Sequence, residues 1–414
     1  MSFKAPCFFC LPCISFLEKI VLFVFVFSMA NAVSNAMYNI AFGLLVAFLL
    51  YAHMVKKSKP LVLPERGIQV PYWIFFLSIF LASVLLGDMP SIQKSVTYFQ
   101  YSLAFWLLYL LCTYDFSKLT IHLAMASSML FVCSYALYLR YGLQVGTRLT
   151  GFAPHPNQFA MYLILTLPFL ILFLLHERKG DDSLAGRILK GFTGMVVVLI
   201  LVDLVLTLSR GAMLGLSIGA VFVFLLQYFW VERRKCGELW KKISILLISI
   251  GILFGGISAT QEGLLRNDGG DRLLLFQSSY AMWMDNKWIG VGLKNWQQSY
   301  QTQYILPEAI EKDLNMPHNT TIYFFSTTGL VGGIGFIVFN VGIFIFLCKK
   351  MKQQPENFYL QAMMWSFVAI NIHGLVDSAL LVRSVLQLYC GLLGIASASC
   401  MNYNLMKTTN QLDK

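Results

Sequence analysis

Residues 191–230 read GFTGMVVVLILVDLVLTLSRGAMLGLSIGAVFVFLLQYFW. Two apolar runs, 191–208 and 211–230, are separated by a single turn that contains Arg210. Each run approaches the roughly 20 apolar residues that a helix needs to cross a hydrocarbon core about 30 Å thick. The stretch therefore predicts a hairpin of two membrane-spanning helices, with Arg210 at the membrane face.

Apolar runs of this kind recur along the whole chain of 414 residues. Hydrophobic residues make up 57% of the sequence and charged residues only 12%, which is too little charge to solvate a soluble protein of this size. We predict an all-α polytopic membrane protein that forms one integral membrane domain over residues 1–414. About twelve transmembrane helices are expected near 14–31, 36–55, 71–87, 96–113, 119–139, 158–175, 191–208, 211–230, 243–260, 319–347, 358–374 and 385–402.

The basic residues indicate the orientation of these helices. With the N-terminus inside, 21 of the 31 Lys and Arg residues fall in predicted cytoplasmic segments and 10 in outer ones. This bias follows the positive-inside rule. It also accounts for the net charge of +11, because the basic residues lie between apolar runs and no basic patch carries interleaved aromatic residues. Nucleic acid is therefore excluded as a partner, and membrane lipids are expected.

One predicted connection is much longer than the others. Residues 261–318 lie between the ninth and tenth transmembrane helices, on the outer side, and long loops commonly carry function. Within this loop, residues 271–285 are typical of an amphipathic helix that lies along the membrane surface. We expect its apolar side to consist of Leu274, Phe276, Tyr280 and Trp283.

Three outer residues form a candidate catalytic site: His318, Arg210 and Arg272. Guanidinium groups bind phosphate in a bidentate manner, and a neutral imidazole accepts a proton near pH 7. Two arginines and a histidine on one face therefore suit a diphosphate and a hydroxyl. Each residue also has a simpler interpretation. Arg210 can extend its head group to the membrane interface, and Arg272 can pair with Asp268 or Asp271. His318 can cap a helix, or its ring can be satisfied by backbone carbonyls.

Two further outer stretches expose polar groups. The first, Arg148 to Gln158, contains prolines and glycine that prevent a regular helix above the sixth span. The second runs from His373 to Arg383, where Asp377 can orient a histidine or form a structural ion pair with Arg383. From these stretches and the residue after His318 we assign substrate-binding roles to Arg148, His155, Asn157, Asn319, Asp377 and Arg383.

One carboxylate lies inside a predicted span. Asp203 falls within the seventh helix, where a buried acidic group marks a proton or ion path or pairs with a neighbouring helix.

At these residues the sequence resembles the O-antigen ligase and polymerase superfamily of bacterial envelope glycan enzymes. Four patches carry the likeness, across roughly residues 148–335: Arg148-x-x-Gly151 with Pro156-Asn157; Ser209-Arg210-Gly211; Arg272 ahead of Gly290-Val291-Gly292; and His318-Asn319 with Gly329 and Gly332.

The resemblance implies transfer of a glycan from an undecaprenyl diphosphate carrier to an acceptor hydroxyl, at the periplasmic face of the bacterial inner membrane. In ligases the acceptor is the lipid A core oligosaccharide, and in polymerases it is another lipid-linked repeat. No metal and no cofactor are expected, because no magnesium-binding carboxylate cluster accompanies the site.

Several functions remain open at this point. The single long loop favours a ligase over an O-antigen polymerase or a protein O-oligosaccharyltransferase. From another class, a twelve-helix transporter or a flippase for lipid-linked glycans has the same hydropathy. Transporters tend to show paired half-repeats with broken helices near the midplane, and the sequence shows no such symmetry.

Overall fold

The computed structural model describes residues 11–31, 34–55, 62–114, 116–176, 183–231, 268–309 and 312–412. The regular elements within these ranges are all helices. In chain order they are α1 (Leu11–Asn31), α2 (Asn35–Val55), α3 (Arg66–Leu86), α4 (Met89–Ser102), α5 (Ala104–Tyr114), α6 (Lys118–Leu137), η1 (Tyr138–Gly142), α7 (Pro156–His176), α8 (Leu184–Leu206), α9 (Arg210–Leu226), η2 (Gln227–Val231), α12 (Asp268–Asp285), α13 (Trp296–Ser299), η3 (Tyr300–Tyr304), α14 (Thr320–Gln353), α15 (Phe358–His373), η4 (Ala379–Leu381) and α16 (Arg383–Leu412).

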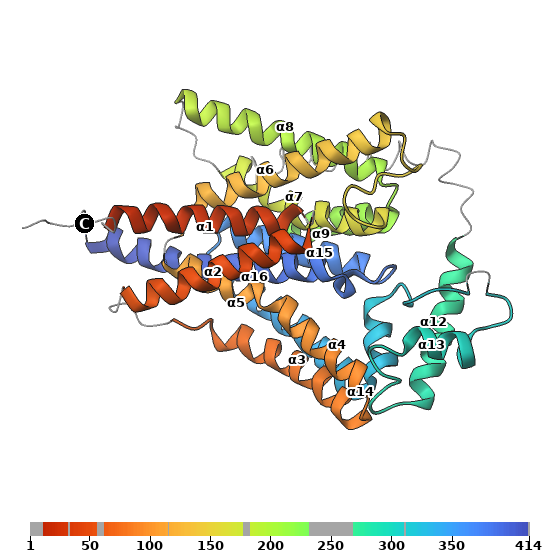
Figure 1. The fold of residues 1–414 in the computed structure, drawn as a ribbon. Coiled ribbons are helices and arrows are strands. Elements are labelled where there is room, and N and C mark those ends of the chain that lie inside the picture. The colour runs from red at the N-terminus through yellow and green to blue at the C-terminus, as the bar shows by residue number, and fades with distance from the viewer. Residues whose placement is uncertain are drawn as a thin grey trace, which may run out of the picture.

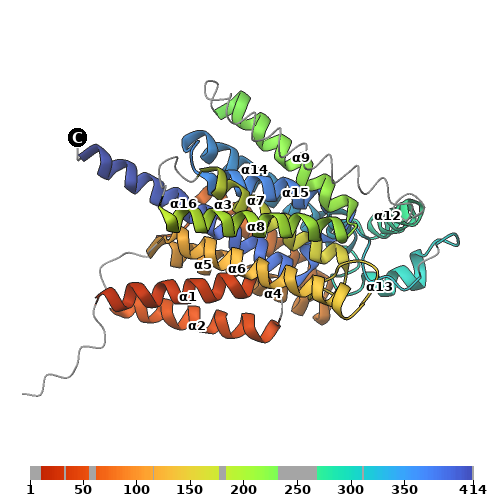
Figure 2. The same cartoon turned by 90° about the horizontal axis from the view of Figure 1, so that it is seen from above.

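The long helices run side by side along one direction, as the two views in Figures 1 and 2 show. The C-terminus lies at one end of this bundle, and α12 and α13 lie at the other (Figure 1). We call the latter the α12 end. α12 itself lies across this end instead of continuing along the bundle (Figure 1).

The described helices have the composition of a membrane protein. Nine of them, counted over the described ranges only, are long and apolar enough to cross a membrane. α1 and α15 run alongside these nine (Figures 1 and 2). The prediction of an all-α polytopic membrane protein is thus confirmed. The predicted ninth span, 243–260, and residues 261–267 of the long loop lie outside the described residues.

Side-chain caps fix where several helices begin. Each cap accepts a hydrogen bond from a backbone N–H group in the first turn, which has no partner within the helix. The capping residues are Asp88, Ser117, Ser183, Asn319 and Asn357.

Close packing of two helices brings α9 against α15. Gly211, Gly215 and Gly219 are spaced four apart, so they lie on one face of α9. A Cβ at Gly215 would overlap the carbonyl of Ala369, and one at Gly219 would overlap Trp365. Small residues at this spacing let helix backbones approach closely within a membrane. The start of α9 is thereby held beside the end of α15.

A break inside α14 is filled by the segment that follows α12. Gly329 has φ 61° and ψ −158°, which interrupts the helix. Backbone bonds from the inserted segment satisfy the freed groups: Val291 N–H donates to Ser326 O at 3.0 Å, and Leu330 N–H donates to Lys287 O at 2.7 Å. Gly290, with φ 68°, faces the same break. Irregular backbone at membrane depth is tolerated where protein satisfies it in this way.

The buried face of α12 differs from the one we predicted. Its enclosed side chains are Leu275, Ser278, Ser279 and Met282. Ser279 Oγ accepts a 3.2 Å hydrogen bond from the indole N–H of Trp296, which lies in α13. Of the predicted apolar side, Trp283 packs edge-on against Phe325 of α14, whereas Tyr280 is 56% exposed. α12 therefore rests mainly on its own loop and on the first turns of α14.

We predict that Gly329→Ala destabilises the protein by about 2 kcal/mol or more. The added Cβ would overlap the Trp288 backbone and occupy a left-handed conformation, and each effect costs on the order of 1–3 kcal/mol. Gly194→Ala in α8 is the control, because nothing lies within 4 Å of its Cβ position. Thermal unfolding of the detergent-solubilised variants measures the difference. Equal stability of the two variants would contradict the prediction.

Candidate active site at the α12 end

A histidine and an aspartate from distant parts of the chain meet at the α12 end. Nδ1 of His318 lies 3.3 Å from Oδ1 of Asp377. A carboxylate has no proton to donate, so Nδ1 must carry the hydrogen of this bond. In a neutral ring, Nε2 then keeps its lone pair and can accept a proton. The His318 side chain is 29% exposed, so a substrate can reach it.

Asp377 is buried yet well provided with donors. Besides His318, the backbone N–H of Ser378 donates to Oδ1 at 2.7 Å. Burial by itself raises the pKa of the Asp377 carboxyl, but the hydrogen bond with His318 and the charges of His373 and His318 leave that pKa well below its ordinary value. The stability from these ionic contacts is therefore complete above the ordinary carboxyl pKa of about 4 and declines as the pH falls toward the lowered value.

The start of α14 is fastened to the turn that carries Asp377. Asn319 Nδ2 donates to Leu375 O at 2.9 Å, and Thr320 N–H donates to Gly374 O at 2.9 Å. The Thr320 hydroxyl also donates to Asp377 O at 3.3 Å. His318, the residue before this anchor, has φ 52°, an uncommon conformation outside glycine that clusters at functional sites.

A chain of hydrogen bonds extends from Asp377 to the turn before α9. Asn157 Nδ2 donates to Asp377 Oδ2 at 2.7 Å, and its Oδ1 accepts from Arg148 Nη2 at 3.0 Å. Arg148 Nε in turn donates to Thr207 O at 2.8 Å. Thr207 lies three residues before Arg210, and Leu208 between them has φ 53°. The patch around Arg148 and Asn157 is therefore linked through Asp377 to His318, and through Thr207 to the turn that carries Arg210.

The two remaining arginines approach the same place from other elements. Arg210 is the exposed first residue of α9. Its neighbour Gly211 packs on His373, since a Cβ there would stand 2.9 Å from Nδ1 of that ring. Arg272, in the first turns of α12, lies close enough for its charge to act on His373. His373 is buried, four residues before Asp377 in sequence. Both arginines thus flank the His373–Asp377 corner.

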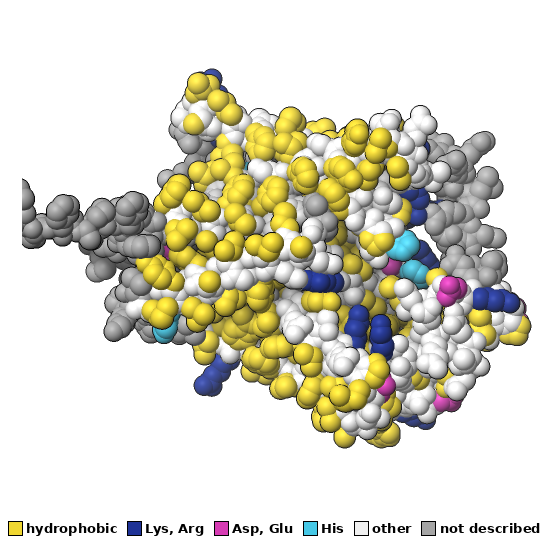
Figure 3. All heavy atoms as spheres, viewed as in Figure 1, with side chains coloured by type: hydrophobic (Ala, Val, Ile, Leu, Met, Phe, Trp, Pro, Cys, Tyr) yellow, Lys and Arg dark blue, Asp and Glu magenta, His cyan; other side chains and the backbone are white. Residues whose placement is uncertain are grey.

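Positive charge predominates in this corner. Figure 3 shows histidine and Lys or Arg side chains gathered at the α12 end, with acidic side chains beside them. The residues just described supply three arginines, Arg148, Arg210 and Arg272, against the carboxylate of Asp377. A surface with this excess of positive charge favours an anionic ligand.

Two further residues with a predicted substrate-binding role, Asn319 and His155, lie near this network. Asn319 is buried, and both of its polar side-chain atoms are used, one as the α14 cap and one on Leu375. It therefore positions its neighbours. The backbone carbonyl of His155 accepts hydrogen bonds from the first turn of α7, and the residue is exposed. The alternative that His318 caps α14 is wrong, because Asn319 is the cap.

Arg383 does not form the ion pair with Asp377 that we considered. Its Nη2 donates to Asn39 Oδ1 of α2 at 2.8 Å, and its guanidinium lies 5.1 Å from the ring centroid of Tyr101 in α4. The Asp377 carboxylate instead accepts hydrogen bonds from His318 and Asn157. Orienting a histidine, the other role considered for Asp377, is the one it takes.

Asp203 is fully buried within α8. Neither of its carboxyl oxygens has a hydrogen-bond partner among the described residues, and Cys133 of α6 is the neighbouring-helix group beside them. A proton or ion path and a partner on a neighbouring helix therefore both remain predictions.

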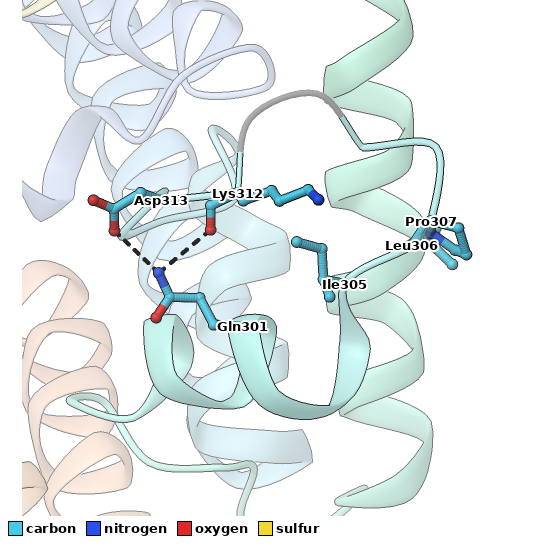
Figure 4. A pocket seen from close by; sticks show the side chains of 6 residues that line it. All are labelled: Gln301, Ile305, Leu306, Pro307, Lys312 and Asp313. Atoms are coloured by element: carbon cyan, nitrogen blue, oxygen red, sulfur yellow. Dashed lines mark hydrogen bonds between the residues drawn. The ribbon is translucent and has the colours of Figure 1, made fainter.

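A cavity of about 520 Å³ opens in the loop that leads to His318. Its lining combines apolar side chains with an amide, an ammonium and a carboxylate: Gln301, Ile305, Leu306, Pro307, Lys312 and Asp313. Gln301 Nε2 donates to Asp313 Oδ1 at 3.0 Å and to Lys312 O at 3.3 Å (Figure 4). Asp313 precedes His318 by five residues, which span at most about 18 Å. Such a lining can hold a ligand with hydroxyls on an apolar frame.

Two residues of this arrangement, His373 and Thr207, had no predicted role of their own. His373 appeared only as part of a polar stretch, and its spacing of four from Asp377 was the available signal. Thr207 contributes its backbone carbonyl, for which a sequence gives no signal.

Comparison with known proteins bears on this arrangement. The family model described as O-antigen ligase matches residues 195–337, about a third of the chain. The matched segment contains Arg210, Arg272 and His318, whereas Arg148, Asn157 and Asp377 lie outside it. No protein with a curated description matches the sequence. Residues 195–337 are thus similar to the O-antigen ligase family, which supports the resemblance to the O-antigen ligase and polymerase superfamily.

Proposed function

We propose that this protein is an O-antigen ligase. It transfers a glycan from undecaprenyl diphosphate to the lipid A core oligosaccharide, at the periplasmic face of the bacterial inner membrane. The observation that carries the proposal is the His318–Asp377 pair, 3.3 Å apart, beside Arg272 and the start of α9 at one end of an apolar bundle.

His318 is the proposed general base. The acceptor hydroxyl gives its proton to Nε2 while its oxygen forms a bond to the anomeric carbon of the glycan. The bond from that carbon to the diphosphate oxygen breaks, and its electron pair leaves with the diphosphate. Attack from the side opposite the leaving group inverts the anomeric carbon. Asp377 keeps the proton on Nδ1 and stabilises the imidazolium that forms.

Arg210 and Arg272 are the proposed partners of the leaving group. Negative charge grows on the diphosphate as the sugar bond breaks, and fixed guanidinium donors stabilise that charge most at the transition state. Arg148 takes a supporting role, because its guanidinium is engaged by Thr207 and Asn157. The bond chain from Thr207 to Asp377 keeps the base and the arginine turn at a fixed separation.

We expect His318→Ala, Arg210→Ala and Arg272→Ala each to lower glycan transfer by about 10²-fold or more, because each removes proton transfer or charge stabilisation. Arg140→Ala is the control: Arg140 lies at the same end and rests on Tyr141, outside the site. Lipopolysaccharide gels measure products, and immunoblots of membranes measure protein level. Near-normal products from any of the three variants at wild-type protein level would refute its role.

Metal chelation tests whether the arginines stabilise the leaving diphosphate without a metal ion. Because guanidinium groups are proposed to meet the leaving-group charge, transfer by the purified protein should be unchanged in EDTA. A loss of activity that added Mg²⁺ or Mn²⁺ restores would contradict this expectation.

The deletion phenotype distinguishes a ligase from a polymerase. Loss of a ligase should leave unmodified lipid A core and let polymer accumulate on the undecaprenyl carrier. A core that carries a single repeat would instead identify a polymerase. Full-length lipopolysaccharide in the deletion strain, with a block in another glycan, would exclude both.

A further inference from the structure

Three cations lie apart from the active-site arginines, on α4 and the elements beside it. Lys94 Nζ lies 5.1 Å from the ring centroid of Tyr98, and the guanidinium of Arg383 lies 5.1 Å from that of Tyr101. Positions 94, 98 and 101 share one face of α4. With Lys294, these cations form what we call the basic stripe: Lys94, Lys294 and Arg383. Figure 3 shows Lys and Arg side chains among hydrophobic ones on this face of the bundle, toward the α12 end.

Backbone contacts force the two lysines together. Lys294 N–H donates to Ser91 Oγ at 3.2 Å, one turn before Lys94. Leu293, the residue before Lys294, is also fixed, because its carbonyl oxygen accepts a 2.7 Å hydrogen bond from the Tyr323 hydroxyl. The two lysines therefore carry like charges at neighbouring backbone positions. An anion placed between them would compensate both charges.

No carboxylate in the described part of the chain pairs with the basic stripe. The nearby Asp88 accepts from Ser91 N–H and from Asn295 Nδ2 instead. Among the described residues, the side-chain amide oxygen Oδ1 of Asn39 is the one hydrogen-bond acceptor of Arg383. Both Lys94 and Arg383 belong to candidate membrane spans, where charged side chains are costly and mark sites for ions or substrates.

The basic stripe adjoins the catalytic pair. The hydroxyls of Tyr98 and Tyr323 interact, and Tyr323 lies one helical turn after Asn319, next to His318. At the other end, Arg383 follows Asp377 by six residues. A lipid whose head group rests on the stripe would thus have its sugars close to His318.

We propose that Lys94, Lys294 and Arg383 bind the phosphate groups of a phosphorylated glycolipid, the acceptor of the transfer; this rests on the proposed function. Lys94 and Tyr101, on which Arg383 rests, are seven positions apart, or about 10 Å along the helix axis, a length that suits a head group with two separated phosphates. Ammonium and guanidinium groups are the side chains that bind phosphate. The diphosphate of the glycan donor binds elsewhere in this proposal, at Arg210 on α9 and Arg272 on α12.

The test measures binding, so it does not depend on transfer activity. The full chain, in phosphatidylcholine nanodiscs, is titrated with lipid A and with enzymatically dephosphorylated lipid A. The triple variant K94Q/K294Q/R383Q should bind lipid A at least tenfold more weakly than the wild type, with little change for the dephosphorylated lipid. Lys294→Gln alone, at an exposed position, should weaken binding several-fold without risk to folding. Arg140→Gln, also a cation on a tyrosine at this end, should bind as the wild type does.

Competition identifies the source of the phosphate. Inorganic phosphate and phosphatidylglycerol should compete poorly with lipid A, because neither carries two separated phosphates on one head group. Equal affinity of the wild type and both variants would overturn the proposal. So would equal loss for the dephosphorylated lipid, or displacement by phosphatidylglycerol at the same concentration. If the wild type binds lipid A through the stripe but transfers no glycan, the proposed function fails while the binding site stands.

Discussion

The Asp377 carboxylate is the group on which the α12 end depends. It is buried and ionised, and a buried charge costs several kcal/mol unless donors compensate it. Its donors come from three segments that are distant in sequence: His318 ahead of α14, Asn157 at the start of α7, and the backbone of Ser378 beside it. The carboxylate therefore orients the candidate base and, through Arg148, the turn that precedes α9. The same buried carboxylate supports both the fold and the proposed chemistry.

Two close backbone approaches keep these segments in place. The glycine face of α9 lets that helix lie against α15, so its first residue, Arg210, stands beside the corner formed by His373. The break at Gly329 admits the segment after α12, whose backbone groups replace the missing helical bonds. Lipid offers no hydrogen bonds, so this internal satisfaction is required. The helices that carry the arginines are thereby fixed relative to the helix that carries the base.

Hydropathy predicted the all-α polytopic fold, because the length and apolarity of a span are local properties of the sequence. The outer polar patches contain the residues that the structure brings together at the α12 end: His318, Asp377, Asn157 and Arg148. The sequence could not predict which side chains pair. Arg383 donates a hydrogen bond to Asn39 and lies over the ring of Tyr101, whereas Asp377 pairs with His318. The buried face of α12 was also not predicted. Small polar serines on this face pack against a tryptophan of the same loop, and such tertiary contacts do not appear in the apolar periodicity of the sequence.

The proposed arrangement has two cationic regions near one histidine: Arg210 and Arg272 on α9 and α12, and the basic stripe along α4. Its most direct test is a cryo-EM map of the protein in nanodiscs with a non-transferable analogue of an undecaprenyl diphosphate-linked oligosaccharide. The account predicts diphosphate density in hydrogen-bonding contact with Arg210 and Arg272, at about 3 Å, with Nε2 of His318 facing the anomeric carbon from the opposite side. Diphosphate density away from both arginines, or a glycan that His318 cannot reach, would contradict it.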